Sequence, residues 1–115
     1  MKRKIIAFGN YYHDFLKTLN EKESRKVKYI ISLLETEDRM PVKFIRHLNE
    51  YGNLYELRIK YERNIYRVFF IFDEGKIVVL FHGFHKKSQK TPKTEIEKAL
   101  KIRREYYDQK RATHL

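Results

Sequence analysis

The sequence predicts one α+β domain, a small antiparallel sheet with two N-terminal helices packed on it and a C-terminal helix behind. The chain of 115 residues is long enough for one hydrophobic core and short for two. Apolar residues recur at helical spacing before residue 35 and after residue 92, whereas residues 54–84 carry apolar runs typical of strands. No linker or internal repeat divides residues 1–115, so we expect a single domain.

The N-terminal third predicts a short strand and a helical hairpin. The strand is expected at residues 4–8. Asn10 can cap a first helix, and Asn20 can cap a second because Glu23 follows it at the spacing of a capping box. The second helix is expected to end at Met40-Pro41. Its buried stripe consists of Val27, Ile30, Ile31 and Leu34.

Three or four antiparallel strands are expected in the middle of the chain. Residues 44–48 alternate weakly, and residues 54–61 alternate clearly between apolar and charged positions. Residues 65–72 are almost continuously apolar and aromatic, as in a central strand covered on both faces. A turn at residues 73–75 then leads into a last strand at residues 76–84.

The C-terminal third predicts a cationic loop followed by a long helix. Residues 85–91 are rich in cations and hydroxyl groups. Thr91-Pro92 suits the start of a helix, because the hydroxyl can cap it and proline is favoured at the first helical position. A partly apolar helix face follows, and we expect the polar residues 109–115 to form a frayed tail.

The composition excludes several classes of protein. Without cysteine there is no disulfide framework, thiolate metal site or cysteine nucleophile. The strongly apolar run at residues 68–72 is too short to span a bilayer, and the N-terminus lacks the pattern of a signal peptide. We therefore expect a cytoplasmic protein without membrane contact. Nucleotide-binding glycine motifs are missing, so no cofactor is expected.

The net charge of +11 is the strongest global feature, from 26 Lys and Arg against 15 Asp and Glu. Such a surface attracts polyanions, and nucleic acid is the commonest of these in cytoplasm. A generally basic protein without such a partner is the alternative. Metal-dependent nuclease chemistry would need convergent carboxylates, which the predicted sheet does not offer. His82 and His85, close to a strand end, leave a metal pair as a minor alternative.

Arg67 interrupts the most apolar strand, which is costly for a charged group unless it is paired. One interpretation is a structural ion pair with Glu56 of the preceding strand. The other is that Arg67 forms the floor of a phosphate site, and both can hold at once. Arg58 and Lys60 share the face of Glu56, so a row of cations is expected there.

RNA cleavage without a metal needs few groups. A base takes the proton of the 2′-hydroxyl, cations stabilise the pentacoordinate phosphorane, and an acid protonates the leaving 5′-oxygen. Arginine suits the phosphorane through its bidentate guanidinium, and Lys, His or Tyr can transfer protons when nearby cations lower their pKa. The chain offers Arg58, Lys60, Arg67, His82, His85, Lys86 and Lys87 for these tasks.

Four motifs in order resemble the HigB branch of the RelE-like toxins, also described as phage-derived Gp49-like proteins. They are Leu54-Tyr55-Glu56-Leu57-Arg58, Ile65-Tyr66-Arg67-Val68-Phe69-Phe70, residues 82–92 (HGFHKKSQKTP) and residues 95–99 (EIEKA). The resemblance spans about residues 3–108. It implies the RelE-like fold, a small antiparallel sheet with two N-terminal helices and a C-terminal helix.

The resemblance also implies an activity and partners. Such a protein would be the toxin of a type II toxin–antitoxin system, a ribosome-dependent endoribonuclease that cuts translated mRNA and forms a 2′,3′-cyclic phosphate without a metal or cofactor. Its partners would be a cognate helix-turn-helix antitoxin of the HigA type, the 70S ribosome and mRNA. Operator DNA would be bound only through the antitoxin.

By the same resemblance, Arg67 matches the strand arginine of the family that contacts the scissile phosphate. Arg58 matches a strand lysine or arginine of the family that faces the active groove. Lys86 or Lys87 matches the basic residue after the last strand. The helix start lacks the tyrosine of other branches, which leaves His85 as candidate acid. Candidate contacts to RNA or the ribosome are Lys60, His82, Lys90, Lys22 and Arg25. A non-catalytic basic nucleic-acid-binding module remains the alternative function.

Overall fold

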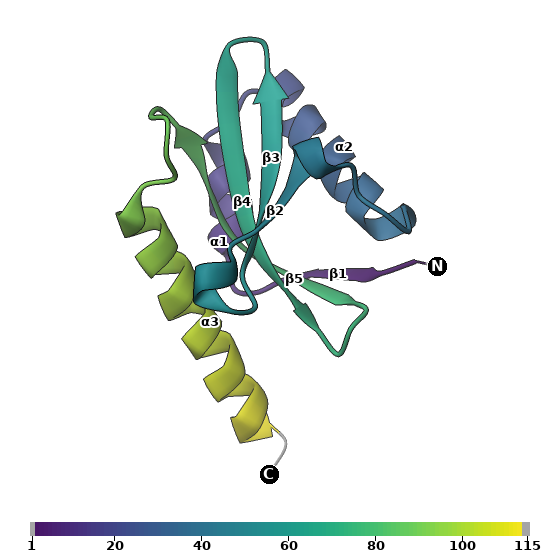
Figure 1. Cartoon of the computed structure of the whole chain (residues 1–115), viewed down its shortest axis with the longest axis vertical. Helices are drawn as coiled ribbons and strands as arrows, with labels where there is room; N and C mark the ends of the chain where they lie inside the picture. Colours follow the sequence, from purple (N-terminus) through teal and green to yellow (C-terminus); the bar gives the residue numbers. More distant parts are fainter. Residues whose placement is uncertain (1, 114–115) are drawn as a thin grey trace.

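Five strands form one sheet with helices on both faces in the computed structural model, which describes residues 2–113 (Figure 1). The apolar runs of the middle of the chain become its central strands. In chain order the elements are β1 (Lys4–Ala7), α1 (Tyr11–Lys17), α2 (Glu21–Thr36), the 3₁₀ helix η1 (Val42–Phe44), β2 (Ile45–His47), the 3₁₀ helix η2 (Asn49–Tyr51), β3 (Tyr55–Tyr61), β4 (Asn64–Asp73), β5 (Ile77–Lys86) and α3 (Lys93–Thr113).

The sheet is mixed, whereas an antiparallel sheet of three or four strands was expected. Its strand order is β1-β5-β4-β3-β2, and the pairs β2–β3, β3–β4 and β4–β5 are antiparallel. β1 pairs with β5 in parallel, with Lys4 opposite Ile77. The alternation of a short edge strand does not encode its direction, so this pairing could not be predicted from the apolar pattern.

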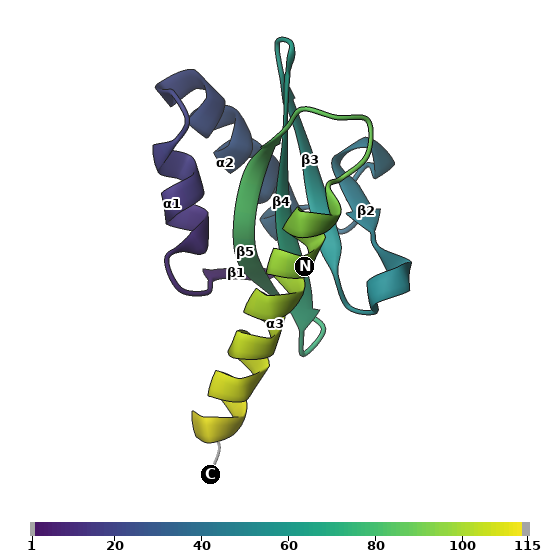
Figure 2. The ribbon, with the colours of Figure 1, turned by 90° about the vertical axis from the view of Figure 1, so that its left-hand side faces the viewer.

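Each face of the sheet has its own hydrophobic core. Helices lie over both faces of the sheet (Figure 2). α1 and α2 cover one face, where the predicted stripe of α2 is buried against β3 and β4. α3 covers part of the other face through Ile96, Ala99 and Ile102. The capping box of Asn20 and Glu23 is confirmed, with both hydrogen bonds at 2.9 Å. Asn10 precedes α1 without a side-chain cap, contrary to expectation.

The last strand and the last helix are both longer than expected. β5 continues through Lys86, so His85 and Lys86 lie in a strand and not in a loop. α3 is helical as far as Thr113, although a frayed tail was expected from residue 109; residues 114–115 lie outside the described residues. The Thr91 hydroxyl does not cap α3 but donates to Glu56.

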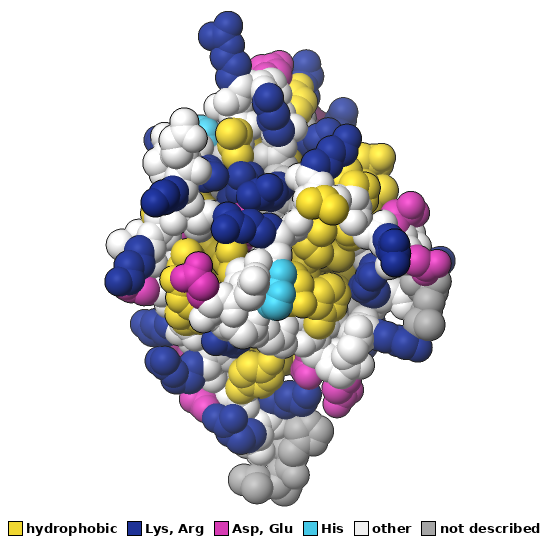
Figure 3. Space-filling view, viewed as in Figure 1, with side chains coloured by type: hydrophobic (Ala, Val, Ile, Leu, Met, Phe, Trp, Pro, Cys, Tyr) yellow, Lys and Arg dark blue, Asp and Glu magenta, His cyan; other side chains and the backbone are white. Residues whose placement is uncertain are grey.

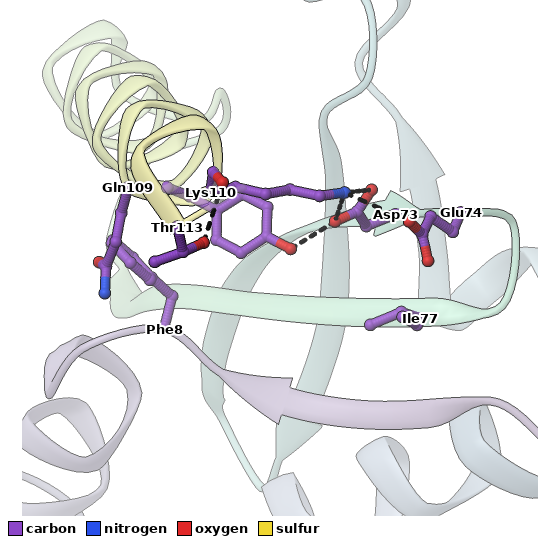
Figure 4. A pocket seen from close by; sticks show the side chains of 8 residues that line it. Phe8, Asp73, Glu74, Ile77, Gln109, Lys110 and Thr113 are labelled. Carbon is purple, nitrogen blue, oxygen red and sulfur yellow. Dashed lines mark hydrogen bonds and ion pairs between the residues drawn. The ribbon is translucent and has the colours of Figure 1, made fainter. Parts of the chain in front are cut away.

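Polar contacts hold the C-terminal half of α3 to the sheet. The Lys110 ammonium donates to both oxygens of Asp73, at 2.9 and 2.8 Å, and the Tyr106 hydroxyl donates to the same carboxylate (Figure 4). Arg103 donates to the carbonyls of Tyr51 and Asn53. α3 is therefore anchored toward the β4–β5 turn, and the opposite half of this sheet face stays open. No helix within residues 2–113 has the length and apolarity to cross a membrane.

Candidate functional site

Four cations surround one carboxylate on the open half of the sheet face that α3 partly covers. We call these residues the Glu56 cluster: Arg46, Glu56, Arg58, Arg67 and Lys86. Strand register brings them together, because Arg46 lies directly opposite Glu56 and Arg58 directly opposite Arg67. Lys86 is opposite Ile65 at the end of β5. In the space-filling view, a group of Lys and Arg side chains (dark blue) lies over the strands next to the start of α3 (Figure 3).

Glu56 is fully buried at the centre of the cluster. Its Oε1 atom lies 3.6 Å from the Nε of Arg58 and 3.6 Å from the Nε of Arg67. Its Oε2 atom accepts a hydrogen bond of 3.0 Å from the Thr91 hydroxyl. The predicted ion pair between Glu56 and Arg67 is thus confirmed. Without this carboxylate, the two opposed arginines would repel each other across the strands.

The ion pairs leave hydrogen-bonding capacity unused. Glu56 Oε1 and the Nε atoms of Arg58 and Arg67 are buried and make no hydrogen bond among the described residues. One terminal nitrogen of Arg67 donates to the Tyr66 carbonyl at 3.2 Å. One carboxylate cannot balance four cations, so the cluster keeps an excess of positive charge. Such a group of oriented, partly desolvated guanidinium groups is suited to a phosphate.

The electrostatics of the cluster lower the pKa of its lysine. Burial lowers the pKa of Lys86 below its ordinary value, Arg67 lowers it further, and Glu56 opposes the shift. Burial likewise lowers the pKa of Arg67, against the attraction of Glu56. A lowered pKa allows a lysine to gain and lose its proton closer to neutral pH, whereas a guanidinium group stays charged. Lys86 is therefore the candidate proton-transfer group within the cluster.

A bulge in β5 decides where the two histidines point. Val68 is opposite Gly83 but Phe70 is opposite Leu80, so β5 has one residue more than β4 in this stretch. His82 thereby faces α3, and its Nε2–H donates to Glu95 Oε1 at 3.0 Å. Its side chain is buried, and desolvation lowers its pKa to about 4. This buried pair does not place His82 at an accessible RNA surface.

His85 lies on the opposite face of the sheet from Arg67. Its ring is 4.9 Å from that of Tyr66, which belongs to the core beneath α1 and α2. The Tyr66 hydroxyl donates to Glu23, and burial with this carboxylate raises the pKa of Tyr66 to about 12. The structure therefore does not bring His85 together with the arginines, although the sequence offered it as the acid.

Some of the other predicted cations lie beside the cluster, and others lie on the helix that covers the opposite face of the sheet. Lys60 lines a hollow of about 390 Å³ together with Arg58, Arg67 and two further lysines, Lys26 of α2 and Lys43 of η1. Lys87 and Lys90 are exposed in the loop after β5. Lys22 and Arg25 are exposed on α2, which covers the other sheet face, and Arg25 is paired with Glu21.

Arg46 is the main cluster residue that the sequence analysis missed. Its strand has only three residues, and their weak alternation gave no sign of a partner. Only the register that places Arg46 opposite Glu56 reveals its role. The presence of a short charged segment just before the clear strand was the one available signal.

Two further features bear on alternative chemistry. A hollow of about 400 Å³ at the far end of α3 surrounds the Asp73–Lys110 pair, whose groups already satisfy one another (Figure 4). It lies away from the Glu56 cluster and serves to attach α3. Among residues 2–113, no three His, Asp or Glu side chains are grouped so that they could hold a metal ion.

Comparisons with known proteins identify a family and solved structures with a similar fold. The model of the family "phage derived protein Gp49-like" matches residues 14–104. A chain in the crystal structure of the archaeal RelE–RelB complex from Pyrococcus horikoshii OT3 has a similar fold, with a TM-score of 0.56 and 19% sequence identity. The match covers 79% of this chain and 100% of that one. No curated protein matches the sequence.

Proposed function

Since the chain belongs to the family of phage-derived Gp49-like proteins, we propose that it is the toxin of a type II toxin–antitoxin system. Its activity would be ribosome-dependent cleavage of translated mRNA in the cytoplasm, as in the HigB type. The observation that carries the proposal is the Glu56 cluster, where four cations on one open sheet face surround a single carboxylate. The fold shared with the archaeal RelE–RelB structure supports it.

In the proposed reaction, the cluster holds the phosphate that is cut. The 2′-oxygen attacks the phosphorus, its proton passes to a base, and the bond to the 5′-oxygen breaks as that oxygen takes a proton. The products are a 2′,3′-cyclic phosphate and a 5′-hydroxyl. Arg58 and Arg67 stabilise the charge of the phosphorane, because their fixed donors need no reorganisation during the reaction. Lys86 supplies or receives a proton, which its lowered pKa favours.

The proposed partners follow from the family resemblance, and the way they would bind follows from the charge of the site. A helix-turn-helix antitoxin of the HigA type would neutralise the toxin by covering the cluster with an acidic or helical segment. Ribosomal RNA would be gripped by exposed cations such as Lys22, Arg25 and Lys60. Operator DNA would be reached only through the antitoxin.

A non-catalytic basic RNA-binding module is the second candidate function. It is favoured by the placement of the histidines, because neither His82 nor His85 lies beside the arginines. In that case the excess charge of the cluster would bind phosphates without moving protons.

Primer extension on mRNA with and without programmed ribosomes tests the proposal. We expect cuts with ribosomes, and we expect Arg67→Ala to lower the cleavage rate by roughly a hundredfold or more, as loss of one transition-state donor does. Lys101→Ala is the matched control, because it removes one exposed cation of α3 and should leave the rate unchanged.

The outcomes separate the two candidates. Ribosome-dependent cuts that vanish with Arg67→Ala would support the toxin. Salt-sensitive RNA binding without any cut would support the binding module. A free-RNA reaction with EDTA tests whether any cleavage without ribosomes needs a divalent metal, since ribosomes themselves need magnesium.

A further inference from the structure

We propose that a hollow next to the Glu56 cluster is a nucleobase subsite, which receives the base beside the bound phosphate and sets the sequence preference of cleavage. This hollow, the η2–α3 pocket, measures about 540 Å³ and is lined by residues 46–51, 89–91, Lys93 and Ile96. It lies between the β2–η2 segment and the loop leading into α3. This inference rests on the proposed ribonuclease function. It adds that a base of the RNA substrate binds in the pocket.

The pocket and the cluster share two residues. Arg46 lines the pocket and lies directly opposite Glu56 in the sheet. Thr91 lines the pocket and donates its hydroxyl to Glu56 Oε2. A phosphate bound to Arg58 and Arg67 would therefore lie beside the pocket. The base of the adjoining nucleotide is then the part of the RNA strand that enters the pocket.

Size and charge fit a nucleotide. The volume lies within the roughly 300–1,000 Å³ of small-molecule sites. Arg46, Lys90 and Lys93 outnumber the single carboxylate of Glu50 around the pocket, which favours a ligand attached to phosphates. The hollow on the other side of the cluster has lysines but no amide side chain, so it suits the sugar–phosphate backbone instead.

Two side-chain amides give the pocket the means to read a base. Asn49 enters from η2 and Gln89 from the loop before α3, so they belong to different walls. Neither amide makes a side-chain hydrogen bond within the described part of the chain. Asn and Gln pair with base edges, and RNA sequence is read mainly from unstacked single-stranded bases.

The wall formed by β2 is held in place before any ligand binds. The His47 ring stacks on Tyr55 with centroids 4.4 Å apart, and its Nε2 lies 2.7 Å from the Gly52 carbonyl oxygen. These contacts lie on the opposite face of the sheet from Arg46, so they fix the backbone of the β2 wall, and a fixed wall loses less entropy on binding than a mobile one. The pocket therefore discriminates by fixed shape as well as by its amides.

A cleavage map of the full chain tests the inference. Parent, Asn49→Ala and Gln89→Ala would each cut a long mRNA on ribosomes, and base frequencies beside the cuts would be counted. We expect each variant to reduce the base preference of the parent by at least about fivefold, the lower range for one lost base contact. Gln109→Ala is the matched control, because its amide lines the hollow at the far end of α3.

The map separates this inference from the proposed function. If the variants cut with the base preference of the parent, the pocket is not a base subsite, whereas the ribonuclease proposal survives. If the parent does not cut at all, the ribonuclease proposal fails. A binding measurement then tests whether the pocket binds a nucleobase.

That measurement is an NMR titration of the parent with a 2′-O-methyl trinucleotide and with its analogue lacking the central base. We expect the side-chain amide signals of Asn49 and Gln89 to shift with the complete trinucleotide and to stay in place with the abasic one. Equal shifts with both ligands, or none with either, would overturn the inference.

Discussion

At the scale of single residues, Glu56 is the group on which the cationic cluster depends. It is fully buried and has a guanidinium nitrogen of Arg58 and one of Arg67 at 3.6 Å. We predict that Glu56→Gln lowers the free energy of unfolding by about 3 kcal/mol, because the buried guanidinium of Arg67 loses its counter-charge. Urea titration at low salt measures the loss.

The control for this prediction is Glu97→Gln, an equal change of charge at an exposed position on α3. It should leave the free energy of unfolding within about 0.5 kcal/mol of the parent. Added inorganic phosphate should restore part of the stability lost in Glu56→Gln, since it supplies the missing negative charge. A loss no larger than that of the control would mean that Glu56 does not hold the cluster together.

His82 makes the stability of the fold depend on pH. Its pKa is about 4 in the folded chain against an ordinary 6.5, mainly because of burial. The unfolded chain therefore binds a proton between these values and the folded chain does not, so stability falls as the pH falls through this window. We predict a loss of about 2 kcal/mol between pH 7 and pH 5 from this group.

Urea titrations of the parent and of His82→Gln at both pH values isolate this effect. The variant keeps a polar group near Glu95 but cannot titrate, so its free energy of unfolding should change less between the two pH values. If parent and variant lose the same stability on acidification, His82 is not the source of the dependence.

At the scale of elements, the contact between α1 and β5 depends on Gly83. A Cβ atom built on Gly83 would lie 2.5 Å from the ring of Phe15. We predict that Gly83→Ala lowers the free energy of unfolding by about 2 kcal/mol through overpacking. The double variant with Phe15→Leu should be more stable than the sum of the two single losses, because the smaller side chain gives room. Strictly additive losses in this cycle would contradict the steric explanation.

The strands show what the apolar pattern can and cannot predict. The alternation of residues 55–61 correctly placed Leu57 and Ile59 in one core and Glu56 with Arg58 on the other face. In a regular strand, His85 would share the face of Val79 and Phe81, which is the face of Arg67. The bulge near His82 reverses this alternation, and a bulge leaves no mark in an apolar run.

At the scale of the whole molecule, the candidate site was predictable in part. Arg58, Arg67 and Lys86 were expected near one another, and the sheet register brings them together. Arg46 was missed because its place opposite Glu56 depends on the pairing of a three-residue strand. The parallel pairing of β1 was missed because its partner, β5, lies far away in the sequence. Pairing between distant segments is a tertiary property, whereas periodicity is a local one.

The charge of the whole molecule predicts that its affinity for RNA depends on salt concentration. We expect the cations of the Glu56 cluster to account for most of this dependence. With a net charge of +11, the proposed RNA binding must weaken as salt rises, but only cations that contact phosphates release counterions. We predict that Arg58→Gln reduces the slope of log K against log salt by about 0.7, the value for one contact to a single strand. Lys101→Gln removes the same charge from the exposed face of α3 and should keep the slope of the parent. Fluorescence titration of a single-stranded RNA at several salt concentrations measures both slopes. Equal reductions in the two variants would mean that charge acts through the overall field and not through the Glu56 cluster.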